Sequence, residues 1–372
     1  MDNELRVIIS GGGTGGHIFP AISIANALKA KCPDAQIKFV GALGRMEMQR
    51  VPAAGYEIVG LPIQGFDRKH LLKNVKVLFK IWKSQRMAKR IIREFRPQVA
   101  VGVGGYASGP TLNQAAAMGI PCLIQEQNSF AGVTNKLLAK KAAKICVAYD
   151  GMERFFPSGK IIKTGNPVRQ ALLDCTLSQQ EAVSTLGLDP ERPVVLIIGG
   201  SLGALTINES VLRHLDEIAA SNVQFLWQTG SYYFADIQQT LQQRGCPENL
   251  KATDFISDMG AAYRAASLVI SRAGASSISE LCLLGKPSIL VPSPNVAEDH
   301  QTHNALALVN REAALMVKDA DAREQLIPLA IKTLTDPTGG YLQLGIHAGQ
   351  MALPHSADII ADEVIRLAQS TH

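Results

Sequence analysis

The side chain best suited to acid–base chemistry in this sequence is a histidine that ends a glycine-rich string. Ser10-Gly-Gly-Gly-Thr-Gly-Gly-His17 follows an apolar stretch and leads into a helical one. The backbone N–H groups of such a strand-to-helix turn point at whatever lies over the helix N-terminus, a setting that binds phosphate. Histidine is the side chain whose ordinary pKa lies nearest neutral pH, and His17 has little packing to do among glycines. These properties favour a general base over a histidine that only caps the helix.

The same string also satisfies the GxGxxG spacing of dinucleotide-binding proteins, at Gly11, Gly13 and Gly16. That fingerprint needs an acidic residue at the end of the second strand, where it holds a ribose. The second strand ends Phe39-Val-Gly-Ala42, without a carboxylate. The missing acid weakens the dinucleotide interpretation.

Two strings in the second half of the chain repeat this chemistry. Gly199-Gly-Ser-Leu-Gly-Ala204 can cradle a diphosphate, with a tight turn that binds no ligand as the alternative. Ser271-Arg-Ala-Gly-Ala-Ser-Ser-Ile-Ser-Glu280 opens a helix with small residues. Glu280 can accept two ribose hydroxyls there, or it is simply a favourable charge near a helix N-terminus. Glycine turns at matching positions in both halves favour a shared ligand.

Polar residues also follow the predicted strands, in segments 104–109, 126–128 and 299–301 and at Asn135. Ligands of open α/β sheets bind at the carboxyl ends of the strands. These residues are therefore candidates for a binding site, and loop capping is the alternative for each.

Metal ligation is not indicated. Asp319-Ala-Asp321 spells the DxD motif of metal-dependent sugar transferases, but Asp321 and Glu324 have capping-box spacing before a helix, and we expect a cap. His300 and His303 have no evident third ligand nearby. We therefore predict no metal site.

Two successive series of strands and helices must position these residues. Apolar strands are predicted at 5–10, 37–41, 99–103 and 121–125, then at 193–198, 223–227, 268–271 and 287–291, with the first helix beginning near Pro20. This alternation predicts an α/β protein with two Rossmann-like parallel-sheet domains, which we expect to face each other across a cleft. The Gly- and Pro-containing segment 163–169 marks the boundary, giving domains 1–165 and 166–372. The last helix is a candidate to pack back on the first domain.

Composition places the chain among cytosolic globular proteins. Its 372 residues suit two domains, and no apolar run reaches the roughly 18 to 20 residues needed to span a bilayer. The N-terminus does not have the pattern of a signal peptide, and the six scattered cysteines fit reduced thiols. Charge is uneven: residues 1–165 hold 24 Lys and Arg against 10 Asp and Glu, and the remainder holds 13 against 22. This asymmetry indicates that the first domain meets a polyanion or an anionic membrane.

The positive charge is concentrated between Arg68 and Arg93, where ten Lys and Arg occur without an acid. Apolar residues recur there at helical spacing: Leu71, Leu72, Val75, Leu78, Phe79 and Trp82. One interpretation is a core-packed helix with a solvated charged face. The other is a helix that docks on an anionic leaflet.

Taken as a set, the motifs resemble those of the bacterial N-acetylglucosaminyltransferases of peptidoglycan synthesis. The matching strings run from residue 11 to residue 305: GGGTGGHIFPA, GVGGYASGP, EQNSFAGVTNK, TGNPVR, GGSLGA with Asn208, DFISDM, SRAGASSISEL and EDHQTHNA. The resemblance implies the GT-B fold and an enzyme that works without a metal or a cofactor. It would transfer N-acetylglucosamine from UDP-N-acetylglucosamine to the 4-hydroxyl of the muramoyl sugar of lipid I. Lipid I is an undecaprenyl-diphosphate-linked muramoyl peptide. The product would be lipid II, with inverted stereochemistry. It also implies a peripheral enzyme on the cytoplasmic face of the bacterial inner membrane, bound to anionic lipid and not to nucleic acid.

The resemblance also assigns roles to residues. Donor-side positions would be Thr14, Gly15, Gly16, Asn128, Arg169, Ser201, Ile256, Ala275, Ser276, Ser277, Ile278, Ser279, Glu280 and Gln301. Ile256 would lie against uracil, Glu280 on the ribose and Gln301 on the sugar, with Tyr106, Glu126 and Asn135 on the acceptor side. The proton acceptor is left open between His17 and Glu126. Leu205 and Ser277 depart from the family pattern and affect only the detail of the phosphate and base contacts.

Three other functions share these features. The first is a glycosyltransferase with a diacylglycerol acceptor, whose donor half would look similar. The second is a UDP-sugar 2-epimerase on the same fold, which needs no lipid. The third is a membrane-bound scaffold that kept a nucleotide site without catalysis.

Overall fold

The computed structural model describes residues 4–64, 74–168, 170–200 and 202–370. They form two compact units, one of residues 1–168 with 353–372 (unit 1) and one of residues 169–352 (unit 2). The boundary expected from the sequence lies just before this division. The chain therefore leaves unit 1 after its seventh strand and returns to it for the last helix.

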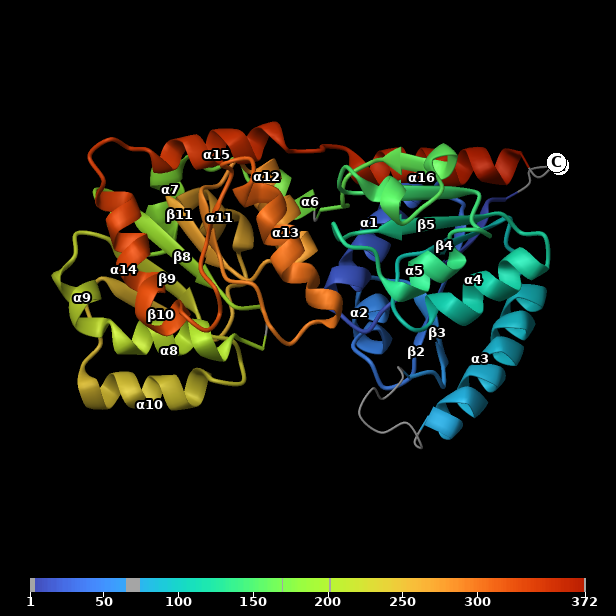
Figure 1. Cartoon of the computed structure of the whole chain (residues 1–372), viewed down its shortest axis with the longest axis horizontal. Coiled ribbons are helices and arrows are strands. Elements are labelled where there is room, and N and C mark those ends of the chain that lie inside the picture. Colours follow the sequence, from blue (N-terminus) through green and yellow to red (C-terminus); the bar gives the residue numbers. More distant parts are fainter. Residues whose placement is uncertain (1–3, 65–73, 169, 201, 371–372) are drawn as a thin grey trace. The chain divides into compact units, whose positions relative to one another are not determined.

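Unit 1 is built on a seven-stranded parallel sheet in the order β3-β2-β1-β4-β5-β6-β7 (Figure 1). Its strands are β1 (Arg6–Ser10), β2 (Gln36–Ala42), β3 (Glu57–Leu61), β4 (Val99–Gly102), β5 (Cys122–Glu126), β6 (Lys144–Val147) and β7 (Ile161–Lys163). Its helices are α1 (Gly15–Lys31), α2 (Glu47–Ala53), α3 (Asn74–Phe95), α4 (Ser108–Ala117), α5 (Val133–Leu138) and α16 (Ser356–Gln369), with short 3-10 turns η2 (Met152–Arg154) and η3 (Ser158–Lys160). The strand order reverses between β1 and β4, which is where ligands of open sheets bind.

Alternating side chains of β1 pack into two separate hydrophobic cores. Val7 and Ile9 pack on one face with α1 and α16, whereas Ile8 packs on the other face with α3 and α4. Because successive strand residues point to opposite faces, a parallel sheet covered on both sides needs nearly continuous apolar strands. The last helix thus packs beside α1, where Lys31 pairs with Asp362 at 2.9 Å.

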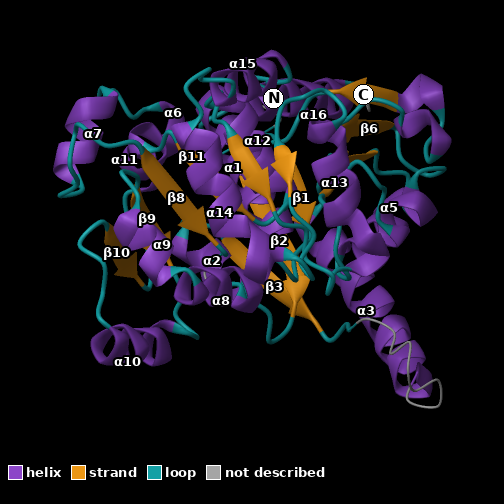
Figure 2. Cartoon of the chain, turned by 60° about the vertical axis from the view of Figure 1, so that its left-hand side comes forward, coloured by secondary structure: helices purple, strands orange, loops and turns teal. Residues whose placement is uncertain are grey.

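Unit 2 repeats the design on a six-stranded parallel sheet in the order β10-β9-β8-β11-β12-β13 (Figure 2). Its strands are β8 (Val194–Ile198), β9 (Gln224–Gln228), β10 (Leu250–Thr253), β11 (Leu268–Ser271), β12 (Ser288–Leu290) and β13 (Leu315–Met316). Its helices are α6 (Gln170–Leu173), α7 (Gln179–Thr185), α8 (Leu205–Arg213), α9 (Leu215–Ala220), α10 (Phe234–Arg244), α11 (Met259–Ala265), α12 (Ala275–Leu283), α13 (His300–Val309), α14 (Ala322–Thr335) and α15 (Tyr341–Gln350), with the 3-10 turn η4 (Ala297–Asp299). Here the order reverses between β8 and β11, the strands that carry the second and third motifs.

One expected boundary is wrong. The first helix begins at Gly15, not near Pro20, and Pro20 lies inside it. Proline has no N–H to donate to the carbonyl of Gly16, but the surrounding core of Ile18, Ala21 and Ile24 keeps the helix continuous. His17 therefore belongs to the first helical turn and its direction is set by the helix.

Candidate functional site

The first glycine turn carries the chain from β1 into α1 with two unusual backbone conformations. Gly12 has φ 145° and Gly13 has φ 89°, values that side-chain-bearing residues rarely adopt. Thr14 then takes the extended N-cap conformation and the helix starts at Gly15. The first amides of a helix have no acceptor within it, so those of Gly15 and Gly16 are placed for a ligand.

Gly16 is not explained by packing inside the protein. A Cβ atom built on Gly16 would meet only Thr14 Oγ1, at the ordinary contact distance of 3.7 Å. Gly12 contrasts with it, because a Cβ atom there would lie 2.2 Å from the Glu47 carboxylate. The open space over Gly16 is therefore available to a bound molecule, as the donor-side prediction for Thr14, Gly15 and Gly16 requires.

The imidazole of His17 is held by its own turn. Its Nδ1 lies 3.0 Å from the carbonyl oxygen of Gly12 and 3.3 Å from Thr14 Oγ1. Facing a carbonyl, Nδ1 of the neutral ring must carry the proton, which leaves Nε2 as the basic nitrogen. Nε2 lies against Gly104, where a Cβ atom would come within 2.9 Å of it. This tautomer is the one that a general base acting through Nε2 needs.

The loop between β4 and α4 supports the turn from the neighbouring strand. A Cβ atom on Gly105 would lie 2.3 Å from the carbonyl oxygen of Gly12, so the two loops are in direct backbone contact. Ser108 Oγ lies 2.7 Å from the Ser10 carbonyl and 2.9 Å from the Gly104 carbonyl, which fixes the loop to β1. Tyr106 projects from this loop with 48% of its surface exposed.

The Glu126 carboxylate organises the loop that follows β5. One oxygen accepts from the backbone N–H (3.0 Å) and side-chain Nδ2 (3.3 Å) of Asn128; the other accepts from the N–H of Gly132 (3.0 Å) and Nδ2 of Asn135 (2.9 Å). Glu126 is 1% exposed. With four donors from its own loop, this carboxylate has no lone pair facing outward for an acceptor hydroxyl. The geometry favours a role for Glu126 in shaping the loop and leaves His17 as the better base.

Sequence reasoning missed Glu47, the other buried carboxylate at this edge of unit 1. It comes from α2 and accepts from the N–H of Gly13 at 2.9 Å and of Ala42 at 3.0 Å. A carboxylate thus does lie at the end of β2, but its partners are backbone amides of the protein. The available signal was an acid just after β2 in an otherwise basic domain.

In unit 2 the second glycine turn is packed against the loop after β9. A Cβ atom on Gly203 would lie 2.1 Å from the Thr229 carbonyl, and one on Gly230 would lie 2.1 Å from the N atom of Gly203. Gln228, also missed from the sequence, links this turn to Ile256: its Nε2 donates to the Gly200 carbonyl (3.2 Å) and its Oε1 accepts from the N–H of Ile256 (2.9 Å). Two predicted donor residues, Arg169 and Ser201, lie outside the described residues.

The third motif forms the first turns of α12. Its backbone passes from β11 through the N-cap Gly274 into the predicted nucleotide residues: Ala275, Ser276, Ser277, Ile278, Ser279 and Glu280. The hydroxyl oxygen of Ser276 is buried without a hydrogen-bond partner within the described protein. Glu280 is 6% exposed and accepts a hydrogen bond from the hydroxyl of Tyr263 at 3.0 Å. Tyr263, from α11, is therefore a further residue of this site that the sequence did not reveal.

Two other predictions in unit 2 concern Gln301 and Asp321. Gln301 lies in the first turn of α13, with Oε1 accepting from the N–H of Ser293 at 2.8 Å, so its side chain is directed to the loop after β12. Asp321 is the N-cap residue of α14, but its side chain makes no capping bond, so the predicted capping box is wrong. Asp319 instead pairs with Arg272 and accepts from Thr206 Oγ1 at 3.0 Å. That network ties the starts of α8 and α14 to the third motif.

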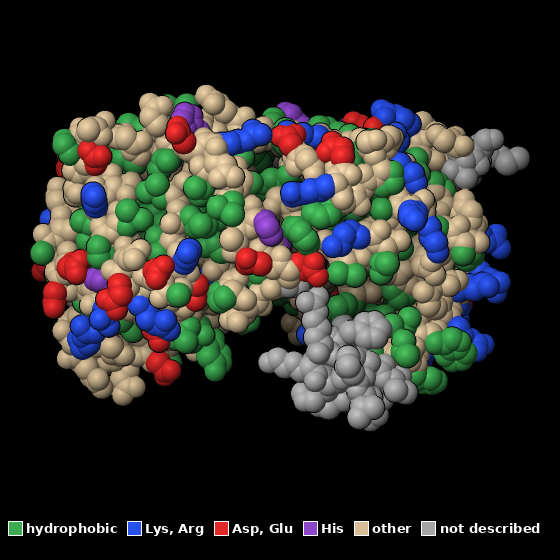
Figure 3. Space-filling view, viewed as in Figure 1, with side chains coloured by type: hydrophobic (Ala, Val, Ile, Leu, Met, Phe, Trp, Pro, Cys, Tyr) green, Lys and Arg blue, Asp and Glu red, His purple; other side chains and the backbone are tan. Residues whose placement is uncertain are grey.

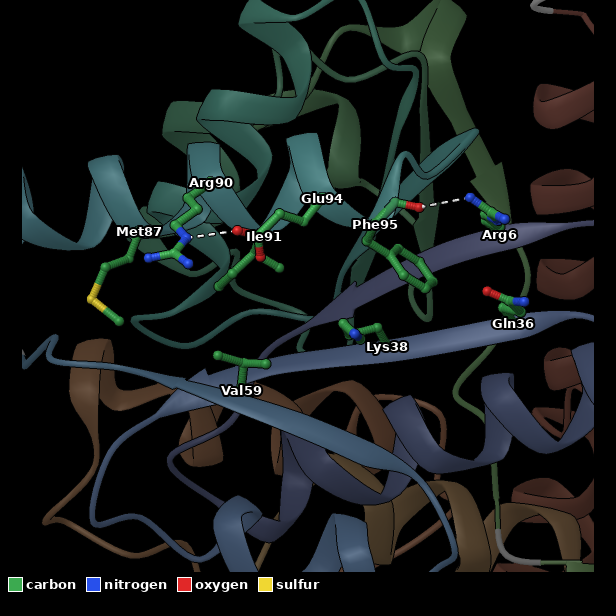
Figure 4. Close-up of a pocket in the computed structure, with 9 residues that line it drawn as sticks. All are labelled: Arg6, Gln36, Lys38, Val59, Met87, Arg90, Ile91, Glu94 and Phe95. Carbon is green, nitrogen blue, oxygen red and sulfur yellow. Dashed lines mark hydrogen bonds and ion pairs between the residues drawn. The ribbon is translucent and has the colours of Figure 1, made fainter.

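A pocket of about 540 Å³ in unit 1 lies away from all these residues. It is lined by the starts of β1 and β2 and by the last turns of α3 (Figure 4). Arg90 pairs with Glu94 at its rim, and Lys38 lies 5.1 Å from the centre of the Phe95 ring. Since ligands of open sheets bind at the opposite, carboxyl ends of the strands, this pocket is not the candidate active site.

The basic helix α3 has one face packed in the core and one exposed face that carries both apolar and basic side chains. Val77, Ala88 and Ile92 are buried against the sheet, whereas Leu78, Phe79 and Trp82 are 58%, 64% and 53% exposed. Exposed basic residues follow along the helix: Lys83, Arg86, Lys89, Arg90 and Arg93. Figure 3 shows Lys and Arg gathered along the edge of unit 1 that α3 forms. The predicted positions 68–73 lie outside the described residues, as do the side chains of Val75 and Lys76.

Two parallel-sheet units, each with a glycine turn at its switch point, have the architecture of the GT-B fold. Residues 7–147 match the N-terminal domain of glycosyltransferase family 28, and residues 194–340 match the C-terminal domain of that family. Between them the two matches cover most of both sheets. The fold expected from the sequence is confirmed in its class.

Individual relatives narrow the assignment. The UDP-N-acetylglucosamine--N-acetylmuramyl-(pentapeptide) pyrophosphoryl-undecaprenol N-acetylglucosamine transferase of Phocaeicola vulgatus is 64% identical over 368 residues, 99% of this chain and 98% of its own. The crystal structure of Acinetobacter baumannii MurG superposes with a TM-score of 0.78 at 28% identity, covering 97% of this chain and 99% of that one. A UDP-N-acetylglucosamine 2-epimerase shares only the fold, with a TM-score of 0.66 at 13% identity over 99% of this chain and 98% of its own. The chain belongs to glycosyltransferase family 28 and, within it, to the MurG transferases.

Among the described residues, no helix combines the length and apolar character needed to cross a membrane.

Proposed function

We propose that this chain transfers N-acetylglucosamine from UDP-N-acetylglucosamine to the 4-hydroxyl of the muramoyl sugar of lipid I and so makes lipid II. The observation that carries the proposal is the 64% identity, over nearly the full length of both chains, to a transferase whose name states this donor and this acceptor. The geometry supports it, because each unit offers a glycine turn and helix N-terminus at its switch point, and unit 1 adds a histidine with a fixed tautomer.

The chemistry is a direct displacement at the anomeric carbon. The acceptor hydroxyl oxygen attacks that carbon as Nε2 of His17 takes its proton, and the bond to the UDP oxygen breaks with inversion. Negative charge grows on the departing diphosphate. Helix-start amides, such as those of the first turn of α12 in unit 2, stabilise it. Glu280 holds the ribose and Ile256 lies against the uracil.

We also infer that transfer needs no metal. Of the residues that the structure describes, no three His, Cys, Asp or Glu side chains group as metal ligands. Both carboxylate oxygens of Asp319, in the DxD string, are already engaged by Arg272 and Thr206. Fixed amide dipoles supply the charge stabilisation that a metal provides in DxD transferases.

The test is an incubation of purified protein with radiolabelled UDP-N-acetylglucosamine and a short-chain lipid I analogue in the presence of EDTA. Label in a lipid-linked disaccharide supports donor, acceptor and metal independence together. Activity that EDTA abolishes and Mg²⁺ restores contradicts metal independence alone. Transfer to diacylglycerol, or lipid-free conversion of UDP-N-acetylglucosamine to its 2-epimer, would replace the proposed function by one of its rivals, and tight UDP binding without turnover would indicate a scaffold.

His17 is tested separately. His17→Ala should bind UDP-N-acetylglucosamine normally and lose roughly 10²- to 10⁴-fold in turnover, the range that general-base catalysis contributes. His347→Ala, on α15, removes a ring that bonds the Glu312 carbonyl and serves as the control. Near-normal turnover of His17→Ala would refute its role as the base.

We propose that α3 docks unit 1 on the anionic inner leaflet of the membrane that carries lipid I. Phe79 and Trp82 stack with ring centres 5.8 Å apart, and the Arg86 guanidinium lies 4.8 Å from the Trp82 ring. Exposed apolar rings beside Lys and Arg suit the boundary between headgroups and acyl chains. Phe79→Ser/Trp82→Ser should lose sedimentation with phosphatidylglycerol vesicles, while Tyr232→Ser, which removes a ring 77% exposed in unit 2, should not. Unchanged sedimentation of the double variant would refute the docking face.

A further inference from the structure

Glu47 and His17 contact the same peptide group from opposite sides. The peptide that joins Gly12 to Gly13 donates its N–H to Glu47 Oε2 at 2.9 Å and offers its carbonyl oxygen to His17 Nδ1 at 3.0 Å. All described peptides of the chain are trans, so the C=O and N–H of this group point in opposite directions. A carboxylate and an imidazole are thereby joined through one planar, polarisable unit.

The Glu47 carboxylate is buried and fixed by backbone hydrogen bonds. Glu47 is 1% exposed, and both partners that the structure gives it are backbone amides, of Gly13 and Ala42. Two glycines make room for its side chain: a Cβ atom on Gly12 would lie 2.2 Å from Oε1, and one on Gly41 would lie 2.6 Å from Cγ. Burying a charge is costly unless donors meet it, and here two backbone amides meet the carboxylate.

The two residues that flank this peptide put no side chain of their own in the way of its rotation. Gly12 and Gly13 both lack a Cβ atom, and glycine populates positive and negative φ about equally. Rotation of this one peptide would swing its carbonyl away from His17 and present an N–H in its place. Nδ1 would then have to be the unprotonated nitrogen and Nε2 would carry the proton, the tautomer that cannot accept one.

We propose that Glu47 is a positioning residue for catalysis, which locks the Gly12–Gly13 peptide and through it holds His17 in the tautomer whose Nε2 is the base. The inference rests on the proposed role of His17. Hydrogen bonds in a chain polarise one another, so the negative charge beside the N–H also strengthens the carbonyl as an acceptor for Nδ1–H. The arrangement does the work of a carboxylate bonded directly to a catalytic histidine, with a peptide group inserted between them.

Glu47→Gln is the sharpest perturbation. The Gln oxygen can accept from one amide, but its NH₂ group then faces the N–H of the other, and two donors cannot bond. We expect turnover to fall roughly 10- to 100-fold, a part of the general-base contribution, while the Kd of UDP-N-acetylglucosamine changes less than about threefold. Glu57→Gln, on the exposed edge of β3, is the control for loss of a carboxylate and should behave as wild type.

The decisive readout is the ¹⁵N spectrum of the histidine rings, with the His17 signals assigned by their loss in His17→Ala. Wild type should show protonated Nδ1, and Glu47→Gln should show a mixture of tautomers. If Glu47→Gln does not fold, Gly41→Ala takes its place. This substitution crowds the Glu47 side chain without removing its charge, and it should shift the same His17 signals. In a double variant with His17→Ala, Glu47→Gln should cost no further turnover, because the two residues act as one unit.

The outcomes separate this inference from the proposed function. An unchanged His17 ring spectrum in both variants, or additive losses in the double variant, would overturn the positioning role even if the enzyme makes lipid II. Near-normal turnover of His17→Ala would overturn the base assignment, and would do so whatever the ring spectra show.

Discussion

Replacing Gly16 by Ala should make the protein more stable and less active at once. A methyl group at this position meets only Thr14 Oγ1, at 3.7 Å, and the residue is the second of α1. Ala is favoured over Gly in a helix by about 0.5–1 kcal/mol, and the first helical turn should give the lower end of that range. The free energy of unfolding should therefore rise by about 0.5 kcal/mol.

Activity should fall because the same methyl group occupies the space over the helix-start amides. A ligand pushed away from these amides loses a hydrogen bond between an N–H group and a charged oxygen, which is worth about 1.5–3 kcal/mol. That loss corresponds to roughly 10- to 150-fold in kcat/KM. A packing role for Gly16 would produce the opposite pattern, with stability lost first.

The assay pairs urea unfolding with steady-state transfer to the lipid I analogue. Gly349→Ala is the matched control: it lies in α15, and a Cβ atom there would meet only the Cα of Gly285, at 3.8 Å. It should gain similar stability and keep full activity. Loss of stability in Gly16→Ala, or full activity with the expected gain, would refute the idea that this glycine is reserved for a ligand.

Three further outcomes are expected. Tyr263→Phe removes the hydroxyl that bonds Glu280 and should raise KM for UDP-N-acetylglucosamine by roughly 3- to 30-fold at similar kcat. If Glu280 binds the 2′-hydroxyl of the ribose, the substitution should not raise KM for the 2′-deoxyribose analogue of this substrate. An equal rise in KM for both substrates would contradict this contact. Burial, and then repulsion by Arg264, lower the pKa of Lys286 to about 8. Between pH 8 and 10.5 the unfolded chain therefore binds more protons, and the stability of wild type relative to Lys286→Met should rise by roughly 1–3 kcal/mol across that window; a flat difference in urea titrations would contradict this burial effect. Burial raises the pKa of the Cys122 thiol to about 12. Iodoacetamide at pH 8 should therefore modify exposed Cys246 first and leave Cys122 intact until the chain unfolds. Early modification of Cys122 in peptide mass spectra would contradict this order.

Most interior strands were predictable from the sequence, whereas the interior strand β6 and the edge strands were not. β1, β4, β8 and β11 are buried on both faces and read as unbroken apolar runs. β3, β7, β10 and β13 close the two sheets at their edges. An edge strand pairs on one side only and tolerates polar residues, as in Glu57 of β3 or Lys251 of β10. Periodicity therefore carries little signal where the sheet ends.

A similar limit applied to the site. His17, Glu126 and Glu280 could be singled out as candidates because each lies inside a string whose spacing is itself informative. Glu47 and Tyr263 could not, because each reaches its partner from a different helix across 34 and 17 residues. Such contacts depend on tertiary packing. A lone acid in a basic domain, or a lone Tyr in a helix, has too many ordinary explanations to be singled out from one sequence.

The two glycine turns differ in what holds them, and the difference indicates what each is for. In unit 1 the buried Glu47 carboxylate accepts the hydrogen bond of the Gly13 N–H, and this bond fixes the Gly12 carbonyl toward His17. In unit 2 the turn is held by neutral backbone contacts with Thr229 and Gly230 and by the amide of Gln228, which add no negative charge near a phosphate. A carboxylate beside a diphosphate would weaken its binding, whereas beside a base it helps. The first turn therefore carries a fixed histidine beside its helix-start amides, whereas the described contacts of the second turn are with neutral groups.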